Sequence, residues 1–352
     1  MSGSRRLLVT VLGMVLISSG TYIVLTRFGT KVGPPPPPTA TTPMFTLPGT
    51  IFVTQHGAIY TVNRGAVAKL KLSPTTLWSH PAVTRDGTQL VVAGGDTRFT
   101  ELYLMSPTGE VGRRLTNDAA REVAQNHWAF YPRFGNDGNS IFYSWDPKDA
   151  GKPLRVDLAV YSLDIKAGEQ PPGRRWTQPD EFTGGDTAPQ PVDGGGLLYA
   201  GYSIGPDRQI QSRIWWQTGP DVAGKPLTEL AANCGRPALS PSGDQLAMIC
   251  SPAADRSRLV VAPFKDGVIG PPSISIDDQL VASPAWSPDG KGIAYLAAGK
   301  AGTGFDLWWV ALSGENAVAA SPTASPAVAS GRRQVTTGLD LDATSAPAWS
   351  PL

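Results

Sequence analysis

Few side chains in this sequence have the types and spacing that catalysis requires. The three histidines, His56, His80 and His127, are far apart and show none of the spacings typical of a metal site. No Gly-x-Ser-x-Gly motif marks a nucleophilic serine. We therefore predict no catalytic residue, no metal and no cofactor.

An Asp-Gly pair recurs in four of the repeated motifs, and carboxylates at such intervals are candidate cation ligands. The aspartates are Asp86, Asp137, Asp193 and Asp289. However, Asp and Gly both tolerate the backbone angles of tight turns, and the Asp side chain hydrogen-bonds to the backbone of its own turn. We interpret the four pairs as turns.

The sequence contains two cysteines, Cys234 and Cys250, which flank a turn at 240–244. A hairpin centred near Ser242 places the two cysteines opposite each other, and a slightly shifted register makes them diagonal neighbours. Directly opposed Cβ atoms are about 5 Å apart, close to what a disulfide needs. We predict a disulfide between them. The alternative is a pair of small buried apolar side chains.

The elements that position these residues come from a repeat. Five times, a Pro stands six residues before a Gly and an apolar run follows; these copies start at Pro81, Pro132, Pro189, Pro237 and Pro284. Each copy is typical of a β-hairpin. A further strand-like run follows, and four repeats end in a Leu-Thr-like pair. Four short strands per repeat predict one blade of a β-propeller, with a β-sandwich array as the alternative.

The two ends of the chain supply the parts of one more blade. A sixth copy of the repeat starts at Pro347 and is cut off by the C-terminus, so residues 345–352 provide a single strand. The region from Thr50 to Leu72 contains strands without a hairpin of the repeat type. Pairing the two ends closes the ring and removes unpaired strand edges. We predict an all-β, six-bladed propeller that is closed by its N- and C-terminal strands.

The string Pro-Ala-Trp-Ser-Pro-Asp-Gly-Lys-x-Ile-Ala-Tyr at 284–295 resembles the repeat of TolB-type six-bladed propellers. The resemblance extends over residues 79–352 and implies the fold, whereas many unrelated functions share this repeat. TolB carries a small α/β domain before its propeller. Here other segments occupy that place, so the partners of TolB are not carried over.

The first 48 residues predict where the propeller resides. Arg5 and Arg6 precede an uncharged apolar run over 7–25, which is long enough to cross a bilayer as a helix. A cleaved signal peptide is the alternative. The expected organisation is a cytoplasmic tail (1–6), a transmembrane anchor (7–26), a proline-rich linker (27–48) and the propeller (49–352). We expect a single-pass protein of the cell membrane, attached through this N-terminal helix, with the propeller on the extracytoplasmic side.

Residues near the repeated prolines should line the axial channel, because the innermost strand of each blade begins there. This set consists of His80, Tyr131, Asp186, Arg236 and Ser283. Its mixed chemistry favours recognition over metal binding. We predict a non-catalytic binding module for a protein, peptide or glycan; the alternative is a metal-dependent channel enzyme of lactonase or lyase type. The 30 basic and 29 acidic residues argue against nucleic acid as a partner.

Overall fold

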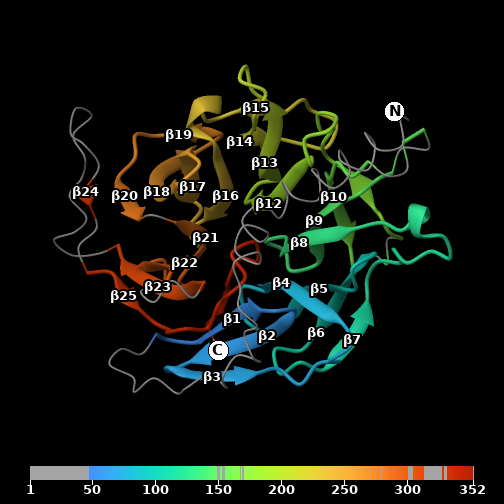
Figure 1. The fold of residues 1–352 in the computed structure, drawn as a ribbon, viewed down its shortest axis with the longest axis horizontal. Helices are drawn as coiled ribbons and strands as arrows, with labels where there is room; N and C mark the ends of the chain where they lie inside the picture. The colour runs from blue at the N-terminus through green and yellow to red at the C-terminus, as the bar shows by residue number, and fades with distance from the viewer. Residues whose placement is uncertain are drawn as a thin grey trace, which may run out of the picture. The chain divides into compact units, whose positions relative to one another are not determined.

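The structure is a computed structural model that describes residues 47–148, 151–152, 155–166, 168, 170–278, 280–299, 304–312, 327–328 and 331–351. These residues form six sheets arranged around a common centre, as Figure 1 shows. Each sheet is one blade, and neighbouring strands within a blade are antiparallel except for β20 and β24, which pair in parallel. The prediction of an all-β, six-bladed propeller is confirmed.

The first three blades are built from the N-terminal half of the described chain and one C-terminal strand. Blade 1 contains β26 (Ala348–Ser350), β1 (Thr50–Gln55), β2 (Ala58–Asn63) and β3 (Ala66–Lys69). Blade 2 contains β4 (Leu77–Val83), β5 (Leu90–Gly95), β6 (Thr100–Met105) and β7 (Val111–Arg114). Blade 3 contains β8 (Ala129–Phe134), β9 (Ser140–Trp145), β10 (Ala159–Asp164) and β11 (Arg174–Arg175).

The other three blades follow in chain order. Blade 4 contains β12 (Asp186–Val192), β13 (Gly196–Ile204), β14 (Ile210–Gln217) and β15 (Lys225–Pro226). Blade 5 contains β16 (Cys234–Leu239), β17 (Gln245–Ala253), β18 (Arg256–Lys265) and β20 (Ile274–Asp278), with the short strands β19 (Val268–Ile269) and β24 (Ala327–Val328) added. Blade 6 contains β21 (Val281–Trp286), β22 (Gly292–Ala298), β23 (Phe305–Ala311) and β25 (Arg333–Gln334).

The ring closes in blade 1, where the C-terminal strand β26 pairs with β1. The register places Thr50 opposite Ser350 and Phe52 opposite Ala348. The indole Nε1 of Trp349 also donates a hydrogen bond to the carbonyl oxygen of Pro48 at 2.8 Å. We predicted that residues 345–352 pair with the strands between Thr50 and Leu72, and this closure is confirmed for residues 348–350, which pair with β1.

The predicted fold class also placed a transmembrane helix before the propeller, and this part requires correction. In the described part of the chain, helical structure is limited to two 3₁₀ turns, Val123–Gln125 and Leu230–Ala232. No helix there is long and apolar enough to cross a bilayer. The Pro-, Gly- and Asp-rich turns limit the regular segments to short strands. The predicted tail (1–6) and anchor (7–26), and all but the end of the linker, lie outside the described residues.

A threonine near the end of four repeats stabilises the outer part of its blade. Its hydroxyl oxygen accepts a hydrogen bond of 2.9–3.0 Å from a backbone N–H of the third strand. The four residues are Thr116, Thr177, Thr228 and Thr336. The fourth strands of these blades are only two to four residues long. The Leu-Thr-like pairs therefore supply contacts that a short strand cannot.

Candidate functional site

Five of the six innermost strands carry the same backbone irregularity at the repeated proline. The residue before each Pro has a positive φ, between 47° and 56°: His80, Tyr131, Ala188, Arg236 and Ser283. The pairing with the second strand shifts at the same place in every one of these blades. Such a bulge redirects side chains, and a left-handed residue other than Gly costs about 1–3 kcal/mol. The repeat thus uses local strain to shape the wall of the channel.

The axial channel contains a small cavity of about 20 Å³ that all six blades line. Its wall includes His80, Tyr131, Arg133, Arg236 and Ala346. A cavity needs about 10–15 Å³ by this measure to hold one water molecule. The space therefore fits a group the size of one or two waters and excludes an organic substrate.

The cavity wall is rich in cations and aromatic rings. The guanidinium of Arg236 lies 4.8 Å from the ring centre of Tyr131, whose other neighbour is the His80 ring at 4.3 Å. Burial lowers the pKa of Arg133 to about 10, and the positive charge of Arg236 contributes to the same shift. Burial opposes the charge on Arg236, but Tyr131, Tyr202 and Asp342 outweigh this effect, so the pKa of Arg236 is raised. Both arginines therefore remain charged at neutral pH.

His80 is neutral in this environment. Its side chain is 8% exposed, and burial is the largest cause that lowers its pKa to about 3. Arg236 and Arg133 lower the pKa further, against the opposing effects of Asp342 and the backbone of Thr344. Nδ1 shares a hydrogen bond of 2.8 Å with the Ser79 hydroxyl, whereas Nε2 has no hydrogen-bond partner among the described residues.

The structure brings three of the five predicted channel residues together and separates the other two. His80, Tyr131 and Arg236 line the cavity. Ser283 is fully buried, and its hydroxyl donates to the carbonyl oxygen of Ala343 at 2.8 Å, so it holds the segment that leads into β26. Asp186 lies two residues before Ala188, which takes the equivalent channel position in blade 4.

A wider funnel lies on the face where the first two strands of the blades are joined by their turns. It has a volume of about 620 Å³ and is lined from all six blades. Arg85 in blade 2 reaches across its mouth: the Nη2 atom lies 3.7 Å from Oδ2 of Asp193 and donates to the carbonyl oxygen of Pro241 at 3.5 Å. Arg133 lines both the funnel and the axial cavity, so it marks where the two spaces meet.

The Asp-Gly carboxylates at this face serve the turns. Asp86 accepts hydrogen bonds from the Thr84 hydroxyl at 2.6 Å and from the Thr88 backbone at 3.1 Å. Asp289 makes the same pattern with Ser287 and Lys291. These bonds favour the charged carboxylates and lower the pKa of both aspartates. Among the described residues, no three His, Cys, Asp or Glu side chains form a group able to hold a metal ion.

Asp186 belongs to a second pocket, of about 570 Å³, which lies between blades 3 and 4 and which we call the blade-4 pocket. Asp186, Gly201 and Arg213 stand in one row across β12, β13 and β14. A Cβ atom on Gly201 would lie 2.7 Å from Nε1 of Trp215 and 3.1 Å from Oδ1 of Asp186, so both side chains extend over this glycine. Nε1 of Trp215 and Nε of Arg213 are buried and find no hydrogen-bond partner in the described part of the chain.

The carboxyl group of Asp186 has an unusual acidity. Burial raises its pKa to about 7, and Asp180 and Asp157 add to the shift, while Thr177 and Arg175 oppose it. Its side chain is only 6% exposed. The blade-4 pocket is not recognisable from the sequence, because Arg213 and Trp215 resemble ordinary strand residues. The only local signal was a glycine, Gly201, inside an apolar strand.

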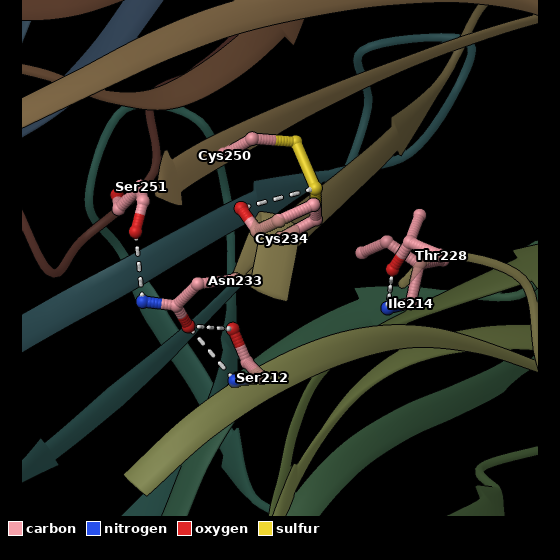
Figure 2. Close-up of a disulfide and its surroundings, with 8 residues drawn as sticks. Ser212, Ile214, Thr228, Asn233, Cys234, Cys250 and Ser251 are labelled. Carbon is pink, nitrogen blue, oxygen red and sulfur yellow. Dashed lines mark hydrogen bonds between the residues drawn. A yellow bond between two sulfur atoms is a disulfide. The ribbon is translucent and has the colours of Figure 1, made fainter. Parts of the chain in front are cut away.

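The two cysteines meet beside the axial strands of blade 5. Cys234 and Cys250 are directly paired across β16 and β17, and their sulfur atoms are bonded at 2.07 Å, as Figure 2 shows. In the same view, the side chain of Asn233 accepts hydrogen bonds from Ser212 and donates one to the carbonyl oxygen of Ser251. Cys234 stands two residues before Arg236, so the disulfide fixes the start of β16, the strand that carries Arg236.

No protein-family model matches this sequence, and no curated protein is similar to it in sequence. Among solved structures, TolB from Acinetobacter baumannii is similar with a TM-score of 0.55 and 17% identity, over 86% of this chain and 66% of that one. A putative TolB from Agrobacterium tumefaciens gives 0.52 and 20%, over 71% and 88%. Hydrazine synthase from Kuenenia stuttgartiensis gives 0.54 and 13%, over 79% and 46%.

These similarities establish the fold, which is a TolB-like β-propeller. The chain spans just under two thirds of the TolB from Acinetobacter baumannii. A hydrazine synthase shares the same architecture at a similar TM-score, so this fold does not fix one function.

Proposed function

We propose that this protein is a non-catalytic binding module that receives a segment of a protein or peptide partner in its funnel. The single observation that carries this proposal is the funnel itself, an open space of about 620 Å³ that all six blades line. Binding pockets typically measure about 300–1,000 Å³. A partner segment that enters along the axis would contact every blade at once.

The lining of the funnel suits a peptide better than an apolar ligand. Its wall combines charged and amide side chains, among them Arg85, Asp137, Asn139 and Gln190, with the rings of Trp286 and Trp349. Such groups can pair with the backbone and polar side chains of an extended segment. Arg85 crosses the mouth through a weak, exposed ion pair, which a partner can displace at little cost.

A metal-dependent channel enzyme receives less support. The narrow end of the channel carries the charges of Arg133 and Arg236, and both repel a divalent cation. The cavity beside them is also too small for a sugar or a lactone.

We further propose that the propeller resides in an oxidising compartment outside the cytoplasm. The paired cysteines support this location, because structural disulfides persist in exported proteins and are rare in the reducing cytosol.

Site-specific photo-crosslinking in the native cells tests the proposed function. A photoreactive amino acid replaces Asn136, an exposed funnel residue, and in a matched control it replaces Asp255, which lies in the exposed turn between β17 and β18. Consecutive turns of a blade lie at opposite ends of its strands, so the control faces away from the funnel. We expect one protein to be crosslinked at Asn136 and absent at Asp255, and an Arg85→Glu change at the mouth to alter its yield.

Equal crosslinking at both positions, or no crosslinked protein at Asn136, would contradict binding in the funnel. Turnover of a lactone or a glycan by the purified protein would instead favour the enzyme.

A further inference from the structure

The axial cavity holds more positive charge than its surroundings balance. Neither Arg133 nor Arg236 forms an ion pair with a carboxylate of the described residues. Asp342 raises the pKa of both Arg236 and His80 but does not line the cavity, and it is a single negative charge beside two guanidinium groups. An unpaired buried charge is costly, and the remedies that proteins use are a counter-charge or a bound ion.

Two hydrogen-bonding nitrogens also point to a missing partner. Nη1 of Arg236 and Nε2 of His80 are buried with no partner at hydrogen-bonding geometry among the described residues, and both residues line the cavity. The backbone of Thr344 is near enough to the His80 ring to raise the pKa of His80. When the Ser79 hydroxyl donates to Nδ1 of His80, the neutral imidazole carries its proton on Nε2 and becomes a donor. The cavity then presents donors alone at these two positions.

We propose that the axial cavity binds one small monovalent anion, such as a halide or formate, between Arg133, Arg236 and Nε2 of His80. This inference goes beyond the proposed function and does not depend on it, because a free anion binds without a partner. Water molecules could satisfy the two nitrogens, but they would leave Asp342 as the one carboxylate that acts on this pair of guanidinium charges.

The size and position of the cavity define the kind of anion. A volume of about 20 Å³ matches an ion of roughly the size of water and excludes phosphate, sulfate and larger carboxylates. Arg133 and Pro284 line both the cavity and the funnel, so the funnel is the route of entry. The ring of Tyr131 covers one face of the Arg236 guanidinium.

Thermal unfolding at constant ionic strength tests this proposal. Bromide replaces gluconate stepwise, and sulfate serves as an anion that is too large. We expect the Tm of the wild type to rise with bromide concentration, because a ligand that binds only the folded state stabilises it. Arg133→Met and Arg236→Met should each weaken bromide binding about tenfold or more, as the loss of a charge-assisted hydrogen bond implies. Arg256→Met, at an exposed position of β18, should leave bromide binding unchanged.

A second measurement keeps the test decisive if a channel variant fails to fold. Wild-type crystals grown in bromide should show an anomalous peak within hydrogen-bonding distance of Arg236. The proposal is overturned if such crystals show no peak in the cavity, or if both arginine variants respond to bromide as the wild type does.

Discussion

The axial cavity and the blade-4 pocket are built on the same fold but have opposite character. The cavity is small and cationic, and its neutral histidine resists protonation. The blade-4 pocket is wide, and its buried Asp186 resists losing its proton. In the cavity, all six blades contribute to one wall, whereas the pocket depends on one row of residues in blade 4. A repeat therefore fixes the geometry of the axis, and departures from the repeat create local sites.

The largest expected effect comes from opening the ring in blade 1. The axial cavity depends on this closure, whereas no residue of the C-terminal strand lines the blade-4 pocket. Deletion of residues 345–352 removes β26, Ala346 from the cavity wall and the buried ring of Trp349. It also removes the Ser345 hydroxyl, which accepts a hydrogen bond from the His80 backbone at 2.8 Å. Loss of a buried Trp alone costs about 3–5 kcal/mol. We expect the truncated chain to lose most of its stability in urea unfolding.

Trp349→Phe is the matched control, because it keeps the strand and an aromatic ring and removes only the hydrogen bond from Nε1 to Pro48 and part of the ring. It should lose much less stability than the truncation. An unchanged Tm after the truncation would mean that β26 is not needed to close the ring.

The different origins of the two sites explain what the sequence could predict. The repeated prolines predicted the blades, the closure and the channel positions of His80, Tyr131 and Arg236. The prediction of Asp186 was off by two residues, because the residue that precedes Pro189 and takes the channel position in blade 4 is Ala188. The blade-4 pocket was not predictable, because it depends on Gly201 lying between Asp186 and Arg213 across three strands. Only the register of the sheet brings these residues together.

The two sites should shift stability with pH in opposite directions. The pKa of Asp186 is raised in the folded state, so its contribution is fully present below about pH 4 and is lost as the pH rises toward 7. The pKa of His80 is lowered, so its contribution is present above about pH 6.5 and is lost as the pH falls toward 3. Each group changes the free energy of unfolding by about 1.4 kcal/mol per pH unit within its window.

Asp186→Asn and His80→Asn separate these two effects in urea unfolding between pH 4 and 8. Relative to the wild type, Asp186→Asn should gain stability as the pH rises, and His80→Asn should gain stability as the pH falls. Asn suits position 80 because it tolerates a positive φ. Asp221→Asn, at an exposed position in the blade-4 pocket, is the control and should change little. Parallel pH profiles for all four proteins would refute the contrast between the sites.

The smallest of these effects concerns the disulfide between Cys234 and Cys250. It lies in the strand that carries Arg236 of the axial cavity, and neither cysteine lines the blade-4 pocket. The disulfide joins residues 16 apart in the sequence, and the chain-entropy model assigns such a loop roughly 3 kcal/mol. Because Cys234 stands two residues before Arg236, Cys234→Ala with Cys250→Ala should destabilise the protein by about this amount and weaken bromide binding. In the double cysteine variant, Asp186→Asn should change the pH dependence of the free energy of unfolding by the same amount as it does in the wild type. Mass spectrometry of unreduced protein from its native source should show the mass of a disulfide, and two free thiols there would reject both the bridge and the proposed oxidising compartment.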